Sequence, residues 1–213
     1  MNVLLIGASG FTGKVVLQSL LSQGHQVTAV TRDLSSLKSH QKGLRILLGN
    51  VLDADFITKA LKNQDAVINC LGIGGKGNAK PNSLVSDAME ILVSAMEKAK
   101  VKRLIAMSNV GAGNSRAFQP WYFTNIILPL FMKWLQVIIE DKNKMEPLIM
   151  NSQLDWTIVR CPNIVDQPAK HTLHATIDGK GLGFSVTNRD VAAFMVDQIN
   201  RTDFLHQAPC VSN

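Results

Sequence analysis

The stretch Asn2-Val3-Leu4-Leu5-Ile6-Gly7-Ala8-Ser9-Gly10-Phe11-Thr12-Gly13-Lys14-Val15-Val16 opens the chain. Its four successive apolar residues predict a buried strand, and the glycines at three-residue spacing predict a tight turn. The apolar periodicity that follows predicts a helix. Strand, glycine turn and helix in this order are how a dinucleotide-binding fold begins.

Each glycine of this turn has a physical role. Gly7 allows a sharp turn, Gly10 lets the backbone approach a pyrophosphate, and Gly13 lets the helix pack closely on the strand. The free N–H groups and positive dipole end of the helix then face the phosphates. The predicted cofactor-binding residues here are Gly7, Ser9, Gly10, Phe11, Thr12 and Gly13. The alternative is a tight strand-to-helix turn that binds nothing.

Composition narrows the class of protein. With 213 residues, 46% apolar and 18% charged, the chain is expected to fold as a single domain over 1–213. A net charge of +6 suggests an anionic partner. The basic residues are scattered, however, which favours a phosphate-bearing cofactor over nucleic acid. Three cysteines without a C-x-x-C pair fit a reducing cytoplasm, and because a strand is expected to begin at residue 2, no signal peptide is expected.

Apolar runs alternate with helical patterns along the chain, which predicts an α/β, Rossmann-type, doubly wound parallel sheet. The expected strands lie near 2–6, 26–31, 44–48, 65–70, 102–107 and 155–160, and the expected helices near 12–23, 53–62, 82–99 and 121–150. A C-terminal piece, 171–213, is expected to contribute a strand near 172–177, a helix near 188–200 and a strand near 205–210. We expect this short elaboration to lie over the cofactor site.

Residues 121–139 are apolar almost all round and about long enough to span a bilayer, which takes roughly 20 residues. Lys133 near the middle and Pro129 interrupt the run. The predicted sheet also needs a helix at this point in the chain. We therefore expect a core or interface helix and no transmembrane span, with a substrate lid or a contact to a protein or membrane surface as the alternative.

The second predicted strand ends in Val30-Thr31-Arg32-Asp33. An acidic residue about twenty positions after the glycines binds the ribose in NAD-selective sites, whereas an arginine accommodates a 2′-phosphate. Arg32 lies nineteen residues beyond Gly13, so NADP(H) is the predicted cofactor. Asp33, one step further, is expected to point away. The alternative is a solvated charged loop.

The remaining strand ends supply further candidates. Asn50 and Val51 would flank an adenine, and Asp53 would cap a helix. Further predicted cofactor residues are Leu71 and Gly72 after the fourth strand, Ser108 and Asn109 at the end of the fifth, and Pro162, Asn163 and Ile164 after the sixth. Backbone N–H groups of the last turn would hold the nicotinamide carboxamide. His171 and His174 would share one strand face, as solvated residues more readily than as metal ligands.

Ser108 is the first candidate catalytic residue, because at the end of the fifth strand it would lie beside the nicotinamide and hydrogen-bond a reacting carbonyl or imine. The alternative is a hydroxyl bonded to a neighbouring backbone group. A short-chain dehydrogenase would add a tyrosine one helical turn before a lysine. Here Tyr122 is followed by Ile126, so that dyad is absent. Lys142 is the second candidate, near ribose or substrate, unless it is a surface lysine.

The motifs at 7–13, 30–33 and Asp155-Trp156-Thr157-Ile158-Val159-Arg160-Cys161-Pro162 resemble the atypical short-chain dehydrogenase/reductase superfamily, in its NAD(P)H-binding branch related to NmrA-like proteins. Within that branch, 49–68 and 166–181 are most similar to the biliverdin-IXβ reductase (flavin reductase) group. The likeness covers nearly the whole chain and fails mainly between 113 and 141. Lys142 and Glu146 fit the related branch, whereas Asn163 stands where the reductases have a histidine.

This resemblance implies an NADPH-dependent reductase that passes hydride to a small conjugated acceptor of the flavin, tetrapyrrole or quinone type. In the reductase group the counterpart of Ser108 lies beside the substrate, and no strong protein acid is required. The alternative is a non-catalytic NADP(H)-binding sensor, regulator or assembly factor, which the missing dyad and the apolar 121–139 segment favour.

Overall fold

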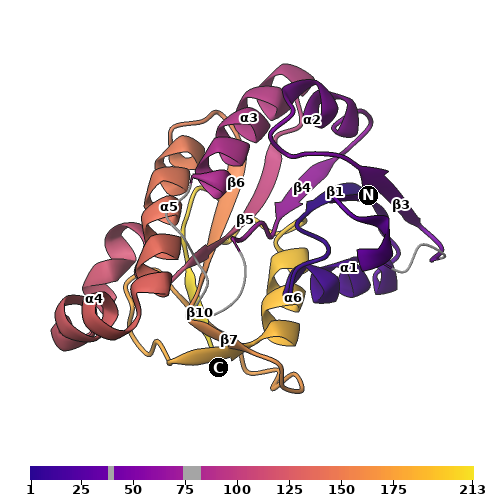
Figure 1. Ribbon diagram of the computed structural model, residues 1–213. Helices are drawn as coiled ribbons and strands as arrows, with labels where there is room; N and C mark the ends of the chain where they lie inside the picture. Colours follow the sequence, from indigo (N-terminus) through magenta and orange to yellow (C-terminus); the bar gives the residue numbers. More distant parts are fainter. Residues whose placement is uncertain (38–40, 74–82) are drawn as a thin grey trace.

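The computed structural model describes residues 1–37, 41–73 and 83–213. Its centre is an eight-stranded sheet in the order β3-β2-β1-β4-β5-β6-β10-β8 (Figure 1). The strands are β1 (Asn2–Ile6), β2 (Gln26–Thr31), β3 (Leu44–Leu48), β4 (Ala66–Asn69), β5 (Arg103–Asn109), β6 (Asp155–Cys161), β8 (His174–Thr176) and β10 (Cys210–Ser212). All pairings are parallel except that of β10 with β8. The order reverses between β1 and β4, which confirms the doubly wound, Rossmann-type arrangement.

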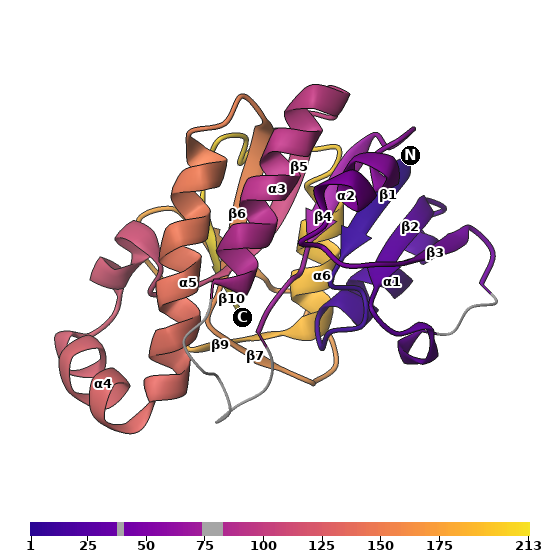
Figure 2. The same cartoon turned by 45° about the horizontal axis from the view of Figure 1, so that its top comes forward.

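Helices cover both faces of the sheet (Figures 1 and 2). They are α1 (Gly13–Ser22), α2 (Ala54–Ala60), α3 (Leu84–Ala99), α4 (Leu128–Phe131), α5 (Lys133–Met150) and α6 (Asn188–Asp197). Val3 and Leu5 of β1 pack with α1 and α6, whereas Leu4 and Ile6 pack with α2, α3 and α5. Because successive strand residues point to opposite faces, the apolar run at the start of the chain fills both halves of the core.

The glycine turn brings the start of α1 against the ends of β1 and β4. Gly7 has φ +80°, and a Cβ there would lie 2.7 Å from the carbonyl carbon of Cys70. A Cβ on Gly13 would lie 2.0 Å from the Gly7 carbonyl oxygen. The roles predicted for Gly7 in the turn and for Gly13 in close packing are therefore confirmed.

The helix expected over 121–150 is interrupted. A π turn over Phe123–Ile127 leads into α4, and the axis then bends by 116° before α5 (Figure 2). Pro129 has no N–H to donate within this segment, which favours local unwinding of the α pattern. Met132 is non-helical, and its carbonyl accepts from the N–H groups of Leu135 and Gln136 at the start of α5.

The C-terminal part differs from the expectation in detail. The last strand is β10 at Cys210–Ser212, so the strand placed near 205–210 is wrong; 203–206 form a turn. A second sheet pairs β7 (Asn163–Val165) with β9 (Ser185–Thr187) at the carboxyl end of β6. Strands this short show too little alternation to be recognised in a sequence. Short helical turns, η1 (Leu34–Ser36) and η2 (Gly113–Phe118), complete the description.

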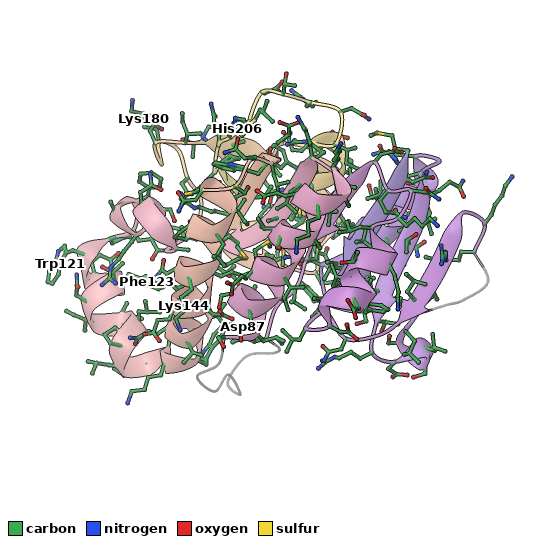
Figure 3. The ribbon with its side chains drawn as sticks, turned by 90° about the horizontal axis from the view of Figure 1, so that it is seen from above. Asp87, Trp121, Phe123, Lys144, Lys180 and His206 are labelled. Atoms are coloured by element: carbon green, nitrogen blue, oxygen red, sulfur yellow. The ribbon has the colours of Figure 1, made fainter. Side chains whose placement is uncertain are left out.

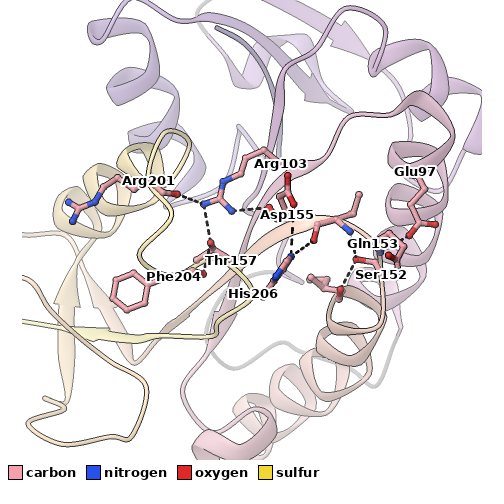
Figure 4. A network of polar contacts seen from close by, with 11 residues as sticks. Glu97, Arg103, Ser152, Gln153, Asp155, Thr157, Arg201, Phe204 and His206 are labelled. Atoms are coloured by element: carbon pink, nitrogen blue, oxygen red, sulfur yellow. Dashed lines mark hydrogen bonds and ion pairs between the residues drawn. The ribbon is translucent and has the colours of Figure 1, made fainter.

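At the amino-terminal ends of β5 and β6, a polar network around Arg103 holds the strands in place (Figure 4). The Arg103 guanidinium donates to the carbonyls of Asp155 at 2.8 Å and of Gln198, and to the Thr157 hydroxyl at 3.0 Å. Gln198 is the C-cap of α6, where free carbonyls and the negative dipole end favour a cation. Arg103 therefore ties α6 to the starts of β5 and β6, away from the predicted cofactor residues.

A comparison of Gly7→Ala with Gly24→Ala distinguishes the loss of stability caused by backbone strain from the loss caused by a steric clash. Both glycines have φ +80°, but a Cβ on Gly24 would meet no atom within 4 Å. We expect Gly24→Ala to lower the free energy of unfolding by about 1 kcal/mol from strain. Gly7→Ala should lose about 1–3 kcal/mol more, because its methyl group collides with the backbone of Cys70 and Leu71, directly after β4. Urea unfolding measures both, and equal losses would contradict the close approach of turn and sheet.

Candidate cofactor and acceptor site

The carboxyl ends of the parallel strands bring the predicted site residues to one edge of the sheet. The glycine turn follows β1, Arg32 follows β2, and Asn50 and Val51 follow β3. Leu71 and Gly72 follow β4, and the end of β5 carries Ser108 and Asn109. Pro162 lies between β6 and β7, and Asn163 and Ile164 belong to β7. In open α/β sheets, ligands bind outside this edge, at the point where the strand order reverses.

The start of α1 has the form of an anion site. No side chain caps the helix, and the Gly10 N–H donates to the Gly7 carbonyl at 3.0 Å, closing the turn. A Cβ on Gly10 would meet only that carbonyl oxygen, at 3.2 Å. Ser9, Gly10 and Phe11 are exposed, and Thr12 is buried. The N–H groups of Lys14, Val15 and Val16 are bonded to the carbonyls of Gly10 and Thr12. Phosphate oxygens fit such a position because the positive end of the helix dipole favours negative charge.

Arg32 is exposed at the end of β2, and no hydrogen bond or ion pair within the described ranges engages its guanidinium. Asp33 is turned to its own loop, as expected. Its carboxylate accepts from the Ser35 N–H at 2.9 Å and from the Ser35 hydroxyl, and these hydrogen bonds lower its pKa. Arg32 is thus the side chain at this strand end that remains open to a phosphate.

Two neighbouring loops have simpler roles. The Asp53 carboxylate accepts from the Phe56 N–H at 3.0 Å, so the predicted helix cap is confirmed. The Asn50 side chain accepts from the Leu52 N–H at 3.1 Å, and Val51 is buried. Gly72 is exposed, and a Cβ there would meet no atom within 4 Å. The Gly72 loop therefore leaves open space beside the ends of β1 and β4.

Ser108 belongs to a buried network at the end of β5. Its hydroxyl donates to Glu146 Oε1 at 2.7 Å, and the residue is only 1% exposed. Arg160 of β6 donates two hydrogen bonds to the same carboxylate, from Nε to Oε1 at 3.0 Å and from Nη2 to Oε2 at 2.6 Å. Because the Ser108 proton is held by Glu146, a ligand at this strand end would meet only the lone pairs of the hydroxyl. The alternative of a serine bonded to neighbouring backbone is wrong.

The network extends to the loop after β5. Arg160 Nη1 donates to the Asn114 side chain at 2.6 Å. Gly113 packs directly on the ion pair, since a Cβ there would lie 2.6 Å from both Arg160 Nη2 and Glu146 Oε2. The Gly113 N–H donates to Asn143 of α5 at 2.8 Å. The charged pair thereby fixes the loop that follows the Ser108 strand.

Lys142 is buried, so the alternative of a surface lysine is wrong. Its ammonium donates to the Met107 carbonyl at 2.8 Å and the Leu71 carbonyl at 3.2 Å, at the ends of β5 and β4. Burial lowers the pKa of Lys142 to about 8, against the opposing effect of Asp141 and other nearby groups. Lys142 thus holds together two strand ends that carry predicted site residues.

Sequence reasoning missed three members of this arrangement: Asp141, Asn114 and the role of Arg160. Asp141 accepts from the N–H groups of Val85 at 2.9 Å and Ser86 at 3.1 Å, in the first turn of α3. The helical spacing of charged and apolar residues in α5 is the pattern that indicates buried charges here. Lys142 and Glu146 lie one turn apart and share a face with buried Met145 and Ile149, which places charges against the core.

A pocket of about 210 Å³ lies between η2, the π turn with α4, and α5. It is lined by both polar and apolar side chains: Arg116, Thr124, Asn125, Leu128, Pro129, Gln136, Ile139, Glu140 and Asn143. Asn143 also bonds Gly113, so the pocket adjoins the loop that packs on the ion pair.

Two expectations from the sequence change. The Asn163 N–H donates to the Phe184 carbonyl at 3.4 Å in the small sheet, so it is not free for a carboxamide, and Pro162 has no N–H. His171 lies before β8 with φ +57°, so it does not share a strand face with His174, whose ring bonds the Lys180 carbonyl. Within the described ranges, no three His, Cys, Asp or Glu side chains gather as metal ligands.

Comparison with known proteins agrees with this geometry. A family model described as NAD(P)H-binding matches residues 7–202. The chain belongs to this NAD(P)H-binding family. The NAD(P)H-binding character expected from the motifs is confirmed.

The relatives extend over most of the chain. UPF0659 protein YMR090W of Saccharomyces cerevisiae is 29% identical over 209 residues, 93% of this chain and 87% of that protein. ChuY, an anaerobillin reductase from Escherichia coli O157:H7, has a similar fold, with TM-score 0.82, 22% identity, and 100% and 97% of the chains covered. A short-chain dehydrogenase/reductase from Veillonella parvula, solved with NADP, has TM-score 0.79, 17% identity, and 100% and 94% coverage.

The ion pair of this NAD(P)H-binding chain gives a direct stability test. Glu146→Leu should lower the free energy of unfolding by about 3–5 kcal/mol, because Arg160 is left buried without a counter-charge. Arg160→Met should cost a similar amount for the converse reason. The double variant should lose clearly less than the sum of the two single losses. Urea unfolding measures this cycle, and additive losses would show that the two charges do not depend on each other.

Proposed function

We propose that the protein is an NADPH-dependent reductase that transfers hydride to a small conjugated acceptor of the flavin, tetrapyrrole or quinone type. The observation that carries this proposal is that three features lie together at the carboxyl ends of the strands. They are the start of α1, which no side chain caps, the exposed guanidinium of Arg32, and Ser108, which is bonded to the buried ion pair. The first two suit a phosphorylated dinucleotide, and the third suits the orientation of a second ligand.

The preference for NADPH is assigned to Arg32. A guanidinium offers a fork of donors that matches a 2′-phosphate, and Asp33, which would otherwise bind ribose hydroxyls, is bonded to Ser35. The NADP complex of the structurally similar Veillonella parvula protein supports NADP(H) as the cofactor. The remaining proposed cofactor contacts are those of the strand ends described above.

The nicotinamide supplies hydride to the acceptor when the cofactor is bound. Ser108, with its proton directed to Glu146, accepts a hydrogen bond from an N–H of a flavin or linear tetrapyrrole and so orients it; a quinone, which has no N–H, gains no such contact. Lys142 fixes the ends of β4 and β5 on either side of this position. The proton that completes the reduction comes from water, because no free acid stands among the proposed residues. The name of ChuY, an anaerobillin reductase of similar fold, supports a reductase.

A second candidate is a non-catalytic NADP(H)-binding sensor, regulator or assembly factor. Tyr122 is exposed at the start of the π turn, whereas Lys142 is buried below the strand ends. The described residues therefore provide no tyrosine–lysine proton relay of the usual short-chain dehydrogenase kind. Binding of NADPH without turnover is the behaviour that distinguishes this candidate.

Cofactor selectivity is tested by thermal unfolding with NADPH and NADH. NADPH at a hundred times its dissociation constant should stabilise the fold by about 2.7 kcal/mol, and NADH at the same concentration by less. Arg32→Asp should reduce or reverse this difference. Lys62→Asp makes the same change of charge in the exposed turn before β4, at the other end of the sheet, and should leave it intact. Equal shifts with both cofactors in the natural protein would refute the role of Arg32.

Turnover is tested by following NADPH absorbance with flavin, linear tetrapyrrole and quinone acceptors. We expect oxidation of NADPH with at least one of them. Ser108→Ala should lower kcat by about tenfold to a hundredfold, because the acceptor loses its orientation. Tight NADPH binding with no turnover on any acceptor would favour the sensor instead.

A further inference from the structure

The π turn and α4 carry a row of exposed apolar side chains, the apolar ridge: Trp121, Tyr122, Ile126, Leu130 and Phe131. Trp121 is 69% exposed and Phe131 is 76% exposed. Thr124 and Leu128, on the inner side of the same segment, are buried. The segment therefore carries large apolar groups on its outer side as well as on its inner side, and the outer ones are left in contact with solvent.

The ridge projects from the body of the protein. In Figure 2, α4 lies beyond the lower end of α5, away from the sheet, and Figure 3 shows Trp121 at the outer edge of the molecule. The wider π turn brings Tyr122, Ile126 and Leu130, spaced four residues apart, toward one side. The polar residue between them, Asn125, donates its amide to the Trp121 carbonyl at 2.8 Å. Its donor is thus satisfied within the segment.

Basic residues flank the ridge in the sequence, and the first acidic residue after it, Glu140, is exposed and lines the pocket behind the ridge with Thr124 and Leu128. No Asp or Glu occurs between Asn109 and Ile139, while Arg116 and Lys133 are exposed on either side of the ridge. The whole chain carries a net charge of +6. An anionic surface is the complement of this pattern. Tryptophan and tyrosine beside aliphatic groups and flanking cations are typical of segments that lie at the headgroup level of a bilayer.

The following helix is bound into the protein. Met145 and Ile149 of α5 are in the core, and Asp141, Lys142 and Glu146 are held in the buried network. No single helix in the described part of the chain is long and apolar enough to cross a membrane. The segments Phe123–Phe131 and Lys133–Met150 would be long and apolar enough only if taken together, and a bend of 116° separates them. Ile126, Leu130 and Phe131 of the ridge lie in the first segment of this pair, Phe123–Phe131, and are exposed.

We propose that the apolar ridge docks on the surface of an anionic phospholipid membrane, with Phe131, Leu130 and Ile126 among the acyl chains near the headgroups. Trp121 and Tyr122 lie at the interface, and Arg116 and Lys133 contact the anionic headgroups. The protein lies on one leaflet and keeps its sheet in water. This proposal does not depend on the proposed reductase activity.

The test is co-sedimentation of the full chain with vesicles of phosphatidylcholine, with and without phosphatidylserine. Binding should be strong only with phosphatidylserine and should fall as salt is raised. The double variant Trp121→Ser, Phe131→Ser should bind at least about tenfold more weakly. Lys133→Glu should weaken binding about fivefold or more. Phe184→Ser, which removes a side chain that is 86% exposed but outside the ridge, should bind like the natural protein.

Thermal unfolding confirms that each variant is folded, so a loss of vesicle binding reports the ridge itself. Failure of the natural protein to bind either vesicle would overturn the proposal, as would equal weakening by the ridge variant and Phe184→Ser. Light scattering gives a further overturning outcome: self-association that Phe131→Ser abolishes, without vesicle binding, would assign the ridge to a second copy of the chain. NADPH turnover in the absence of vesicles tests the reductase separately.

Discussion

The buried ion pair between Glu146 and Arg160 is the interaction on which the site depends. Removing two charges from water is costly, and the cost is offset only if every donor and acceptor around them is paired. Here the pairing is bidentate, with Ser108 and Asn114 bonded to its two partners. The pair therefore joins β5, β6, α5 and the loop after β5 in one arrangement.

The same constraint shapes α5. Three of its charges point inward, and each has a defined partner: Asp141 on the start of α3, Lys142 on the ends of β4 and β5, and Glu146 on Arg160. Such directional contacts fix the position of a helix along its axis more narrowly than apolar packing does. Because α5 is held in this way, its first turn has a fixed position, and so has the bend at Met132 from which the preceding segment projects.

Cofactor binding and chemistry are thus assigned to separate parts of the proposed site. The dinucleotide side rests on backbone geometry, namely the glycine turn, the uncapped start of α1 and the strand ends. The acceptor side rests on side chains brought together from β5, β6 and α5. Backbone geometry follows from local glycine and strand patterns, whereas side-chain geometry depends on contacts between residues far apart in the chain. For this reason the family is clear from the sequence while the acceptor remains a proposal.

The sequence by itself determined the alternation of strands and helices, the positions of β1, β2 and β3, the glycine turn and the cap at Asp53, because each follows from periodicity or local stereochemistry. It did not determine the break at Met132, the short β7 and β9, or the position of β10, since local patterns there are weak or conflicting. Only the tertiary structure decided that Lys142 is buried, that Asp141 caps a distant helix and that Arg160 meets Glu146. Charges of this kind are stable in a core only when a partner from another element is present, and that partner is fixed by the folded chain.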